Sequence, residues 1–248
     1  MYIRLDNGFY IVGGGNAGPG ISNFKDCNVY LLTDKDQAFL IDSGSGLNTP
    51  QIFENIAEAG CPLENIKYLF ITHSHGDHAG GIVDFQAAIK KCRVVASREE
   101  SRLIREGTEF EMGLTAAKHK GAYPQDYRFR HTGTDLIAEN LMQFSVGEIT
   151  ITALIIPGHS IESVCYLVEK SARKILFSGD TLYLNGVLSV INCYGSSMEA
   201  YRNHLPKLAG LNIDALIPSH FGFTLTNGQS HIDKAIEYLK SSSLPPMM

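Results

Sequence analysis

The stretch Thr72-His73-Ser74-His75-Gly76-Asp77-His78-Ala79-Gly80-Gly81 places three imidazoles and one carboxylate within six consecutive residues. Neutral imidazole nitrogens and ionised carboxylate oxygens are the ligands that zinc and similar divalent ions prefer. The preceding run Tyr68-Leu69-Phe70-Ile71 is apolar and predicts a buried strand that ends at the cluster. A histidine-rich surface turn is the alternative interpretation. We favour a metal site at the edge of a sheet, because four such donors are hard to satisfy with partners in a core.

The composition describes a globular chain of 248 residues, for which we favour one domain, 1–248. No apolar run approaches the roughly 18 residues that a membrane span requires. The start, Met1 to Asp6, carries an early acid and lacks the apolar segment of a secretory signal, so we expect a cytoplasmic protein without a membrane partner. The five cysteines are dispersed and form no C-x-x-C pair, which indicates reduced thiols rather than disulfides. The net charge of -5 argues against a nucleic-acid partner.

Apolar runs between turn signals predict the other elements of the chain. Strands are expected at 8–12, 27–32, 37–42, 67–72, 93–96, 148–156, 163–168, 174–177 and 214–218. Helices are expected from about Pro50 to a cap at Gly60, and at 81–89, 197–208 and 230–239. This order, strands-helix-strand-helix and then the same again, predicts two similar halves. Their sheets would pack face to face with helices outside.

Two segments have patterns that need a separate interpretation. Residues 13–20 formally contain G-x-G-x-x-G, but a second strand follows instead of a helix. We therefore expect a hairpin-type loop that borders the site, and no dinucleotide loop. At Ser97-x-x-Glu100 a capping-box pattern predicts the start of a charged helix, with Leu103 and Ile104 facing inward.

Residues 98–140 predict a helical or irregular insertion better than a sheet strand, because apolar residues are mixed with many charges. We expect this insertion over or beside the metal edge. Three roles are open for its basic residues: guiding an anionic substrate, a homodimer contact, or a solvated charged face. These basic residues are Arg102, Arg105, Lys118, Lys120, Arg128 and Arg130.

Three further donors stand where predicted strands end: His159 in Pro157-Gly158-His159-Ser160, Asp180 in Ser178-Gly179-Asp180-Thr181, and His220 in Pro218-Ser219-His220. With the first cluster they make seven donors. The order H-x-H-x-D-H, then His, Asp and His, resembles that of the metallo-β-lactamase superfamily over nearly the whole chain. Among its branches the chain looks most like the glyoxalase II and N-acyl homoserine lactonase hydrolases.

The resemblance implies an α/β (α+β) fold, a four-layer αββα sandwich, with a dinuclear metal site at one edge. One ion would be held by His73, His75 and His159, and Asp180 would bridge to the second ion. That second ion would be held by Asp77, His78 and His220. We expect two divalent ions, zinc first, with iron or manganese as alternatives. Five neutral histidines and two carboxylates leave such a pair with net positive charge, which favours a bridging hydroxide.

Residues around the expected site refine the branch and the substrate. A histidine at position 75 differs from the carboxylate that is typical of the flavodiiron branch. Glyoxalase II typically carries a C-terminal helical extension that binds glutathione, whereas 28 residues follow His220 here, so glutathione thioesters are disfavoured. Tyr183 stands at the spacing where the lactonases carry a tyrosine that contacts the substrate carbonyl, and a packing aromatic is its alternative role. Asp42 is either a partner to a ligand histidine or a turn cap.

We predict a metal-dependent hydrolase that uses the bridging hydroxide on a small-molecule carbonyl ester, lactone or thioester, with Asp77, Asp180 and Tyr183 assisting. An iron-dependent persulfide dioxygenase with one metal, a phosphodiesterase on the same metals, and a metal-bearing scaffold without catalysis are the open alternatives. A true β-lactamase is disfavoured because those enzymes are normally exported. The remaining histidines, His119, His131, His204 and His231, are expected at the surface.

Overall fold

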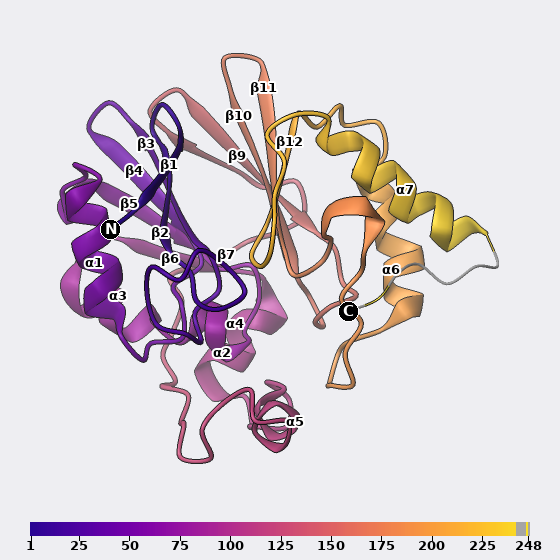
Figure 1. Cartoon of the computed structure of the whole chain (residues 1–248), viewed down its shortest axis with the longest axis horizontal. Helices are drawn as coiled ribbons and strands as arrows, with labels where there is room; N and C mark the ends of the chain where they lie inside the picture. Colours follow the sequence, from indigo (N-terminus) through magenta and orange to yellow (C-terminus); the bar gives the residue numbers. More distant parts are fainter. Residues whose placement is uncertain (242–246, 248) are drawn as a thin grey trace.

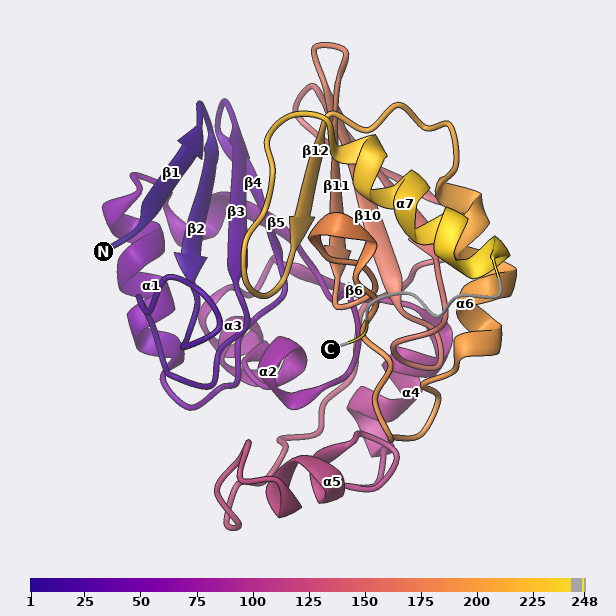
Figure 2. The same cartoon turned by 45° about the vertical axis from the view of Figure 1, so that its right-hand side comes forward.

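Two β-sheets pack face to face, and helices cover both outer faces (Figures 1 and 2). The coordinates are a computed structural model that describes residues 1–241 and 247. The four layers are those of the αββα sandwich that the sequence predicted. Among the helices that the structure describes, none combines the length and the apolar composition needed to cross a bilayer.

The first sheet is built by the first half of the chain, and its order follows the sequence from β1 to β7. Strands β1 to β4 pair antiparallel, whereas β4 to β7 pair parallel. Parallel neighbours end at the same edge, so this edge collects the loops that follow β4, β5 and β6. The strands are β1 (Ile3–Asp6), β2 (Phe9–Gly13), β3 (Val29–Asp34), β4 (Gln37–Ile41), β5 (Ile66–Phe70), β6 (Arg93–Ala96) and β7 (Leu136–Ile137).

The second sheet is built by the second half, in the order β12-β11-β10-β9-β8. Strands β8 to β11 pair antiparallel and β12 pairs parallel with β11. Strands β9, β11 and β12 therefore run in one direction and end at the same edge. The strands are β8 (Gln143–Val146), β9 (Ile149–Ile155), β10 (Val164–Lys170), β11 (Arg173–Gly179) and β12 (Ala215–Pro218).

Three apolar clusters separate the four layers, because successive side chains of a strand point to opposite faces. In β3, Tyr30 and Leu32 face the second sheet, while Leu31 faces the helices of the first half. In the second sheet, Tyr166 faces the centre and Leu167 faces the helices of the second half. Strands buried on both faces read as continuous apolar runs, which is why the sequence located them well.

The outer helices agree with the prediction except near their ends. The first half is covered by α1 (Thr49–Glu58), α2 (Gly76–Ala79) and α3 (Ile82–Ala88), and the second by α6 (Met198–His204) and α7 (Gly228–Lys240). Gly60 follows α1 with φ +81, the left-handed conformation expected of a C-terminal cap. The helix predicted at 197–208 is divided: α6 is followed by the 3-10 turn η3 (Leu205–Leu208), which contains Pro206. Proline has no N–H to continue the α-helical ladder.

The insertion at 98–140 contains α4 (Arg98–Glu106), α5 (Leu114–His119) and irregular chain, and then returns to the first sheet. The return strand β7 pairs with β6, so the expectation of no sheet strand was wrong at this point. In Figures 1 and 2 the insertion lies below the sandwich, at the end where α2 lies. Within α4, Leu103 and Ile104 are buried as predicted. The helix begins directly after Ser97, as the capping-box pattern predicted, but the side-chain bonds of a capping box do not form: the side chain of Ser97 caps no helix N–H and donates instead to the carbonyl of Glu162 at 2.7 Å.

Candidate metal centre

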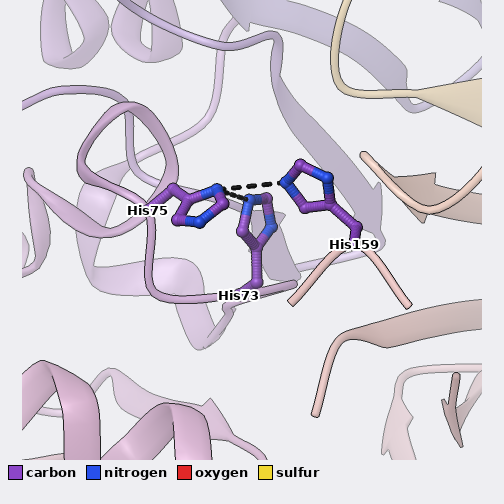
Figure 3. Close-up of side chains that lie close together, drawn as sticks. All are labelled: His73, His75 and His159. Atoms are coloured by element: carbon purple, nitrogen blue, oxygen red, sulfur yellow. Dashed lines mark hydrogen bonds between the residues drawn. The ribbon is translucent and has the colours of Figure 1, made fainter. Parts of the chain in front are cut away.

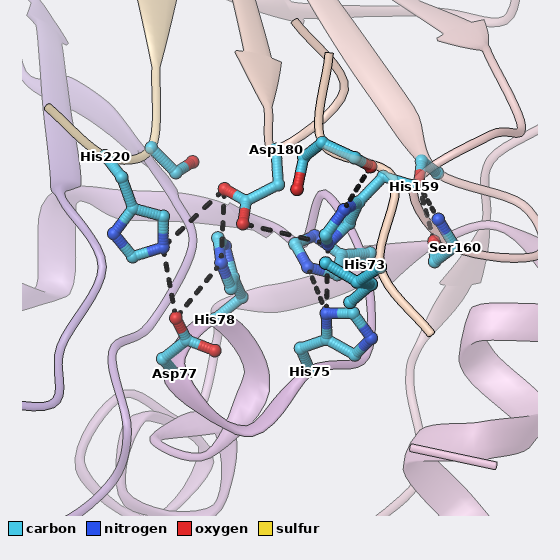
Figure 4. Close-up of polar contacts among 12 residues, drawn as sticks. His73, His75, Asp77, His78, His159, Ser160, Asp180 and His220 are labelled. Atoms are coloured by element: carbon cyan, nitrogen blue, oxygen red, sulfur yellow. Dashed lines mark hydrogen bonds and ion pairs between the residues drawn. The ribbon is translucent and has the colours of Figure 1, made fainter. Parts of the chain in front are cut away.

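All seven predicted donors lie together at the edge where the strands of both sheets end (Figure 4). The turn after β5 and the single-turn helix α2 carry His73, His75, Asp77 and His78. From the second sheet, the loops after β9, β11 and β12 carry His159, Asp180 and His220. Each half of the chain therefore contributes donors to one place, as the strand-end positions predicted.

The first donor set consists of three imidazoles whose nitrogens converge (Figure 3). Nδ1 of His75 lies 3.0 Å from Nε2 of His73 and 3.0 Å from Nε2 of His159. Three imidazole nitrogens at this spacing leave a common point that one cation could occupy. We call His73, His75 and His159 the triad.

The second donor set consists of Asp77, His78 and His220. Oδ2 of Asp77 lies 3.1 Å from Nε2 of His220 and 3.5 Å from Nε2 of His78. Asp180 lies between the two sets. Its Oδ1 is 3.6 Å from Nε2 of both His78 and His220, whereas its Oδ2 is 3.7 Å from Nε2 of His159. One carboxylate thus presents a different oxygen to each donor set.

Unsatisfied polar atoms at this place fit a bound cation. Nε2 of His78 and Oδ1 of Asp180 are buried and have no hydrogen-bond partner within the described part of the chain. A buried polar atom without a partner costs free energy, so most such atoms in proteins are paired or bind an ion. Histidine nitrogens and carboxylate oxygens are also the donors that a divalent ion of the zinc type prefers.

Burial keeps the triad uncharged. It lowers the pKa of His75 and of His159 to about 4, and the pKa of His73 falls well below its ordinary value. The imidazoles are therefore neutral at pH 7 and their lone pairs are free to coordinate. For Asp180, burial raises the pKa, but the neighbouring His220 and His78 outweigh burial and hold it well below the ordinary value. The triad thus offers neutral nitrogens beside an ionised carboxylate. For His78 and His220, burial lowers the pKa, but the neighbouring acidic groups outweigh burial and raise the pKa above its ordinary value.

Asp42 is a partner to a donor histidine, the first of the two roles expected for it. It is buried at the end of β4 with φ +62, and its Oδ2 lies 2.9 Å from Nδ1 of His78. The same carboxylate accepts hydrogen bonds from the Thr72 N–H at 2.8 Å and the Ser219 hydroxyl at 3.0 Å. Such a contact fixes which nitrogen of His78 faces the site.

Two other donors have partners that orient them. Nδ1 of His159 lies 3.1 Å from the carbonyl of Ser189, which leaves its Nε2 for the triad. The hydroxyl of Tyr123 donates to Oδ1 of Asp77 at 3.0 Å, which leaves Oδ2 for the second set. Tyr123 belongs to the insertion, so the insertion reaches the metal edge, as expected.

Sequence reasoning missed three residues at this place: Glu100, Tyr123 and Cys27. Glu100 looked like part of a capping box, and Tyr123 stood in a segment without a clear period. Cys27 is buried beside Asp42 and His78, and burial raises the pKa of its thiol, so it stays protonated. No spacing in the sequence relates these residues to the donors, because each reaches the site from a separate loop or helix.

Tyr183 is buried, with 4% of its surface exposed, and its ring contacts that of Phe221. Its hydroxyl has no hydrogen-bond partner among the described residues. Burial and the charge of Asp180 raise its pKa well above the ordinary value, so it is a neutral phenol. The side chain is therefore packed, as one interpretation expected, and still has a free proton close to Asp180.

The loop at 13–20 contains no helix and lies beside the second donor set. The carbonyl of Ala17 accepts the N–H of Phe221, the residue after His220, at 2.5 Å. Residues 16–19 together with Asn28, Phe221 and Phe223 line a cavity of about 350 Å³. This agrees with a loop that borders the site and excludes a dinucleotide loop.

The four other histidines lie outside both donor sets, and none belongs to a group of potential metal ligands in the described residues. His119 and His131 are exposed, while His204 and His231 are partly exposed. Most basic residues of the insertion are paired with acids, which weakens their use as guides for an anion. The pairs are Arg102 with Glu99 and Glu111, Arg105 with Glu106, Lys118 with Glu109, and Arg130 with Asp84.

Comparison with known proteins gives a consistent family. The model of the Metallo-beta-lactamase superfamily matches residues 23–220. The lactamase-like protein aptB of Emericella nidulans is 28% identical over 231 residues, 92% of this chain and 59% of aptB. The acyl-coenzyme A thioesterase MBLAC2 of Bos taurus is 26% identical over 217 residues, 78% of this chain and 72% of MBLAC2. The chain spans 53–60% of the length of the first curated relatives.

Solved structures show the same fold. The metallo-beta-lactamase GOB-18 from Elizabethkingia meningoseptica superposes with a TM-score of 0.72 at 20% identity, covering 96% of this chain and 89% of that chain. The subclass B3 metallo-beta-lactamase BJP-1 of Bradyrhizobium japonicum gives 0.69 at 21% identity, covering 96% and 89%. At this level of identity the likeness concerns the fold alone.

Proposed function

The chain belongs to the metallo-beta-lactamase superfamily, and we propose that it is a dinuclear metal-dependent hydrolase of small carbonyl esters, lactones or thioesters. The observation that carries the proposal is the position of Asp180, which presents one oxygen to each of two donor sets. A single-metal site would need only one of these sets. A carboxylate between two sets is typical of a site for two ions.

We assign the residues as follows. His73, His75 and His159 would hold one divalent ion, zinc in the first instance, and Asp77, His78 and His220 the other, with Asp180 between them. When bound, such ions lower the pKa of water and polarise a carbonyl oxygen. These seven side chains carry two carboxylates, so two dications would leave the site positively charged and attractive to a developing oxyanion.

The chain's own polar groups suit carbonyl hydrolysis. Tyr183 has a neutral hydroxyl without an acceptor in the described residues, and it can donate to an oxyanion that forms beside Asp180. Asp77 keeps Oδ2 toward the second set because Tyr123 occupies Oδ1. The carboxylates of Asp77 and Asp180 are thus the basic groups beside the donor sets that can orient the attacking water and accept its proton.

A thioester is the substrate that we place first among these. The similarity to the thioesterase MBLAC2, which covers 78% of this chain, supports this choice. The lactone and ester alternatives are supported by Tyr183, whose hydroxyl can donate to the oxyanion that forms from the substrate carbonyl. All three substrates pass through a tetrahedral oxyanion, so one site can serve each of them.

Metal analysis and a substrate panel on one preparation test the proposal. We expect about two ions per chain and turnover of thioesters, lactones or esters. One iron per chain with oxygen uptake would instead support a dioxygenase, and turnover of phosphodiesters alone would overturn the assignment of the substrate.

The variant Asp180→Asn tests the residue on which the proposal depends. Asparagine keeps the shape but offers one acceptor oxygen in place of two, so we expect at least one ion to be lost and turnover to fall together with it. Full activity with both ions retained would show that Asp180 does not join the two sets.

A further inference from the structure

Glu100 is a buried acidic side chain whose contacts the proposed mechanism does not use. It lies in the first turn of α4 and has 0% of its surface exposed. Within the described chain, no lysine, arginine or histidine forms an ion pair with it. Burying a carboxylate without a cationic partner is costly unless hydrogen bonds or a nearby metal ion compensate the charge.

The carboxylate of Glu100 touches both loops that carry the triad. Its Oε2 accepts the backbone N–H of Ser74 at 2.8 Å, and Ser74 lies between His73 and His75. Its Oε1 accepts the hydroxyl of Ser160 at 2.5 Å, and Ser160 follows His159. One side chain thus joins the triad residues of the first half to the triad residue of the second half.

Only a carboxylate can make this set of bonds. Oε1 also accepts the N–H of Glu162 at 3.1 Å, so each oxygen faces at least one backbone donor. A glutamine would have to turn its NH₂ group toward one of these N–H groups, and one buried bond would become a clash between donors. The arrangement therefore requires the negative charge and both oxygens.

The negative charge of Glu100 also compensates for the absence of a carboxylate among the three triad residues. The three triad ligands are all imidazoles, whereas the second donor set includes the carboxylate of Asp77, and its His78 is also bonded by the carboxylate of Asp42. In the low-dielectric interior a buried anion favours a dication nearby. Partners that orient ligands from behind typically change metal affinity when they are removed.

We propose that Glu100 is the anionic positioning residue of the triad, which holds the two triad loops in register and raises the affinity of the triad for a divalent ion. The inference rests on the proposed metal centre. It assigns Glu100 to the first ion alone, because its contacts are with the triad loops and not with the residues of the second set.

Zinc titration of metal-free protein with a competing chromophoric chelator tests this role one site at a time. The background His220→Ala weakens the second set and leaves the triad intact. Adding Glu100→Gln to it should lower zinc affinity ~10–100-fold. In the complementary background His159→Ala, which disrupts the triad, the same change should leave the zinc affinity unaltered.

Two further variants control for position and for folding. Glu99→Gln makes the same chemical change one residue earlier, where the side chain pairs with Arg102 on the surface, and should leave both affinities unaltered. Ser160→Ala removes one of the three donors and keeps both backbone bonds, so it should lower triad affinity in the same direction by a smaller factor. If Glu100→Gln does not fold, the zinc affinity of Ser160→Ala at the triad tests the inference.

Urea unfolding of the metal-free variants separates positioning from a merely structural role. A variant that unfolds more easily but binds zinc at the triad as tightly as its background would overturn the inference and leave the proposed function standing. A parent protein that binds no divalent ion at either set would instead overturn the proposed function itself.

Discussion

For Tyr183 we expect one substitution to have opposite effects on activity and on stability. Its hydroxyl is buried without a partner in the described residues, beside Asp180. For the variant Tyr183→Phe we expect kcat to fall ~10²–10³-fold if the hydroxyl donates to the oxyanion. The free energy of unfolding should rise or stay unchanged, because an unsatisfied buried group is removed. Steady-state kinetics, metal analysis and thermal unfolding give the three readouts, and unchanged kcat would leave Tyr183 as a packing residue.

Tyr123 acts on the second donor set from the insertion. Removing its hydroxyl in Tyr123→Phe leaves Oδ1 of Asp77 without its donor, and we expect zinc affinity at the second set to fall ~10-fold. Tyr127→Phe is the matched control, because its ring lies 4.7 Å from that of Tyr123 but its hydroxyl donates to backbone carbonyls. Equal losses in both variants would assign the effect to packing of the insertion rather than to Asp77.

At the level of elements, the sequence located the strands that are buried on both faces, including the edge strand β12, and missed the edge strands β1, β7 and β8. The run before His73 is continuous and apolar, so β5 was predicted nearly to its ends. Strands β1 and β7 are short, partly exposed edge strands, and their residues carry no clear alternation. They form because a neighbouring strand offers unpaired backbone N–H and C=O groups. The local sequence does not indicate where that neighbouring strand lies.

The dependence on neighbours that are distant in the sequence also explains which site residues could be predicted. The seven donors follow strand ends and occur in the order of the family that the chain resembles, so they could be named from the sequence. Glu100 and Tyr123 depend on how α4 and the insertion pack against those loops. The pattern Ser97-x-x-Glu100 gave the wrong partner for Glu100, because three donors from the triad loops and Glu162 outweigh one N-cap bond.

The contact between β11 and the loop after β5 gives a prediction about two elements. Gly179 has φ +55, and a Cβ atom there would lie 2.8 Å from Cβ of Thr72, the residue before His73. Gly179→Ala should therefore cost ~1–3 kcal/mol of unfolding free energy and loosen metal binding, because two donor loops must move apart. Gly210→Ala is the control: its φ is +67 but a Cβ atom meets nothing within 4 Å, so it measures the backbone cost alone. Similar losses in both variants would contradict the packing argument.

In the whole molecule, the two halves are joined at both ends of the sandwich. At the metal edge, Asp42 and Glu100 each bond residues of both halves. Away from that edge, Asp34 at the end of β3 has a similar role, because it also contacts residues of the second half. Its Oδ1 lies 2.8 Å from Nζ of Lys170, and its Oδ2 accepts the N–H of Glu148 at 2.6 Å. Neither half can therefore separate without exposing buried acidic groups.

Asp34 makes the stability of this junction depend on pH. The bond from Lys170 and then the N–H of Glu148 hold the pKa of Asp34 below its ordinary value. The folded state therefore binds this proton less readily than the unfolded state, where an aspartate titrates near ~3.9. The stabilising contribution is complete above that pH and is lost as the pH falls through the lower folded pKa. Urea unfolding of metal-free protein between about pH 6 and pH 3 should show this loss, and Asp34→Asn should be less stable at neutral pH and converge with the parent in acid. Parallel curves over the whole range would show that Asp34 does not couple the two sheets.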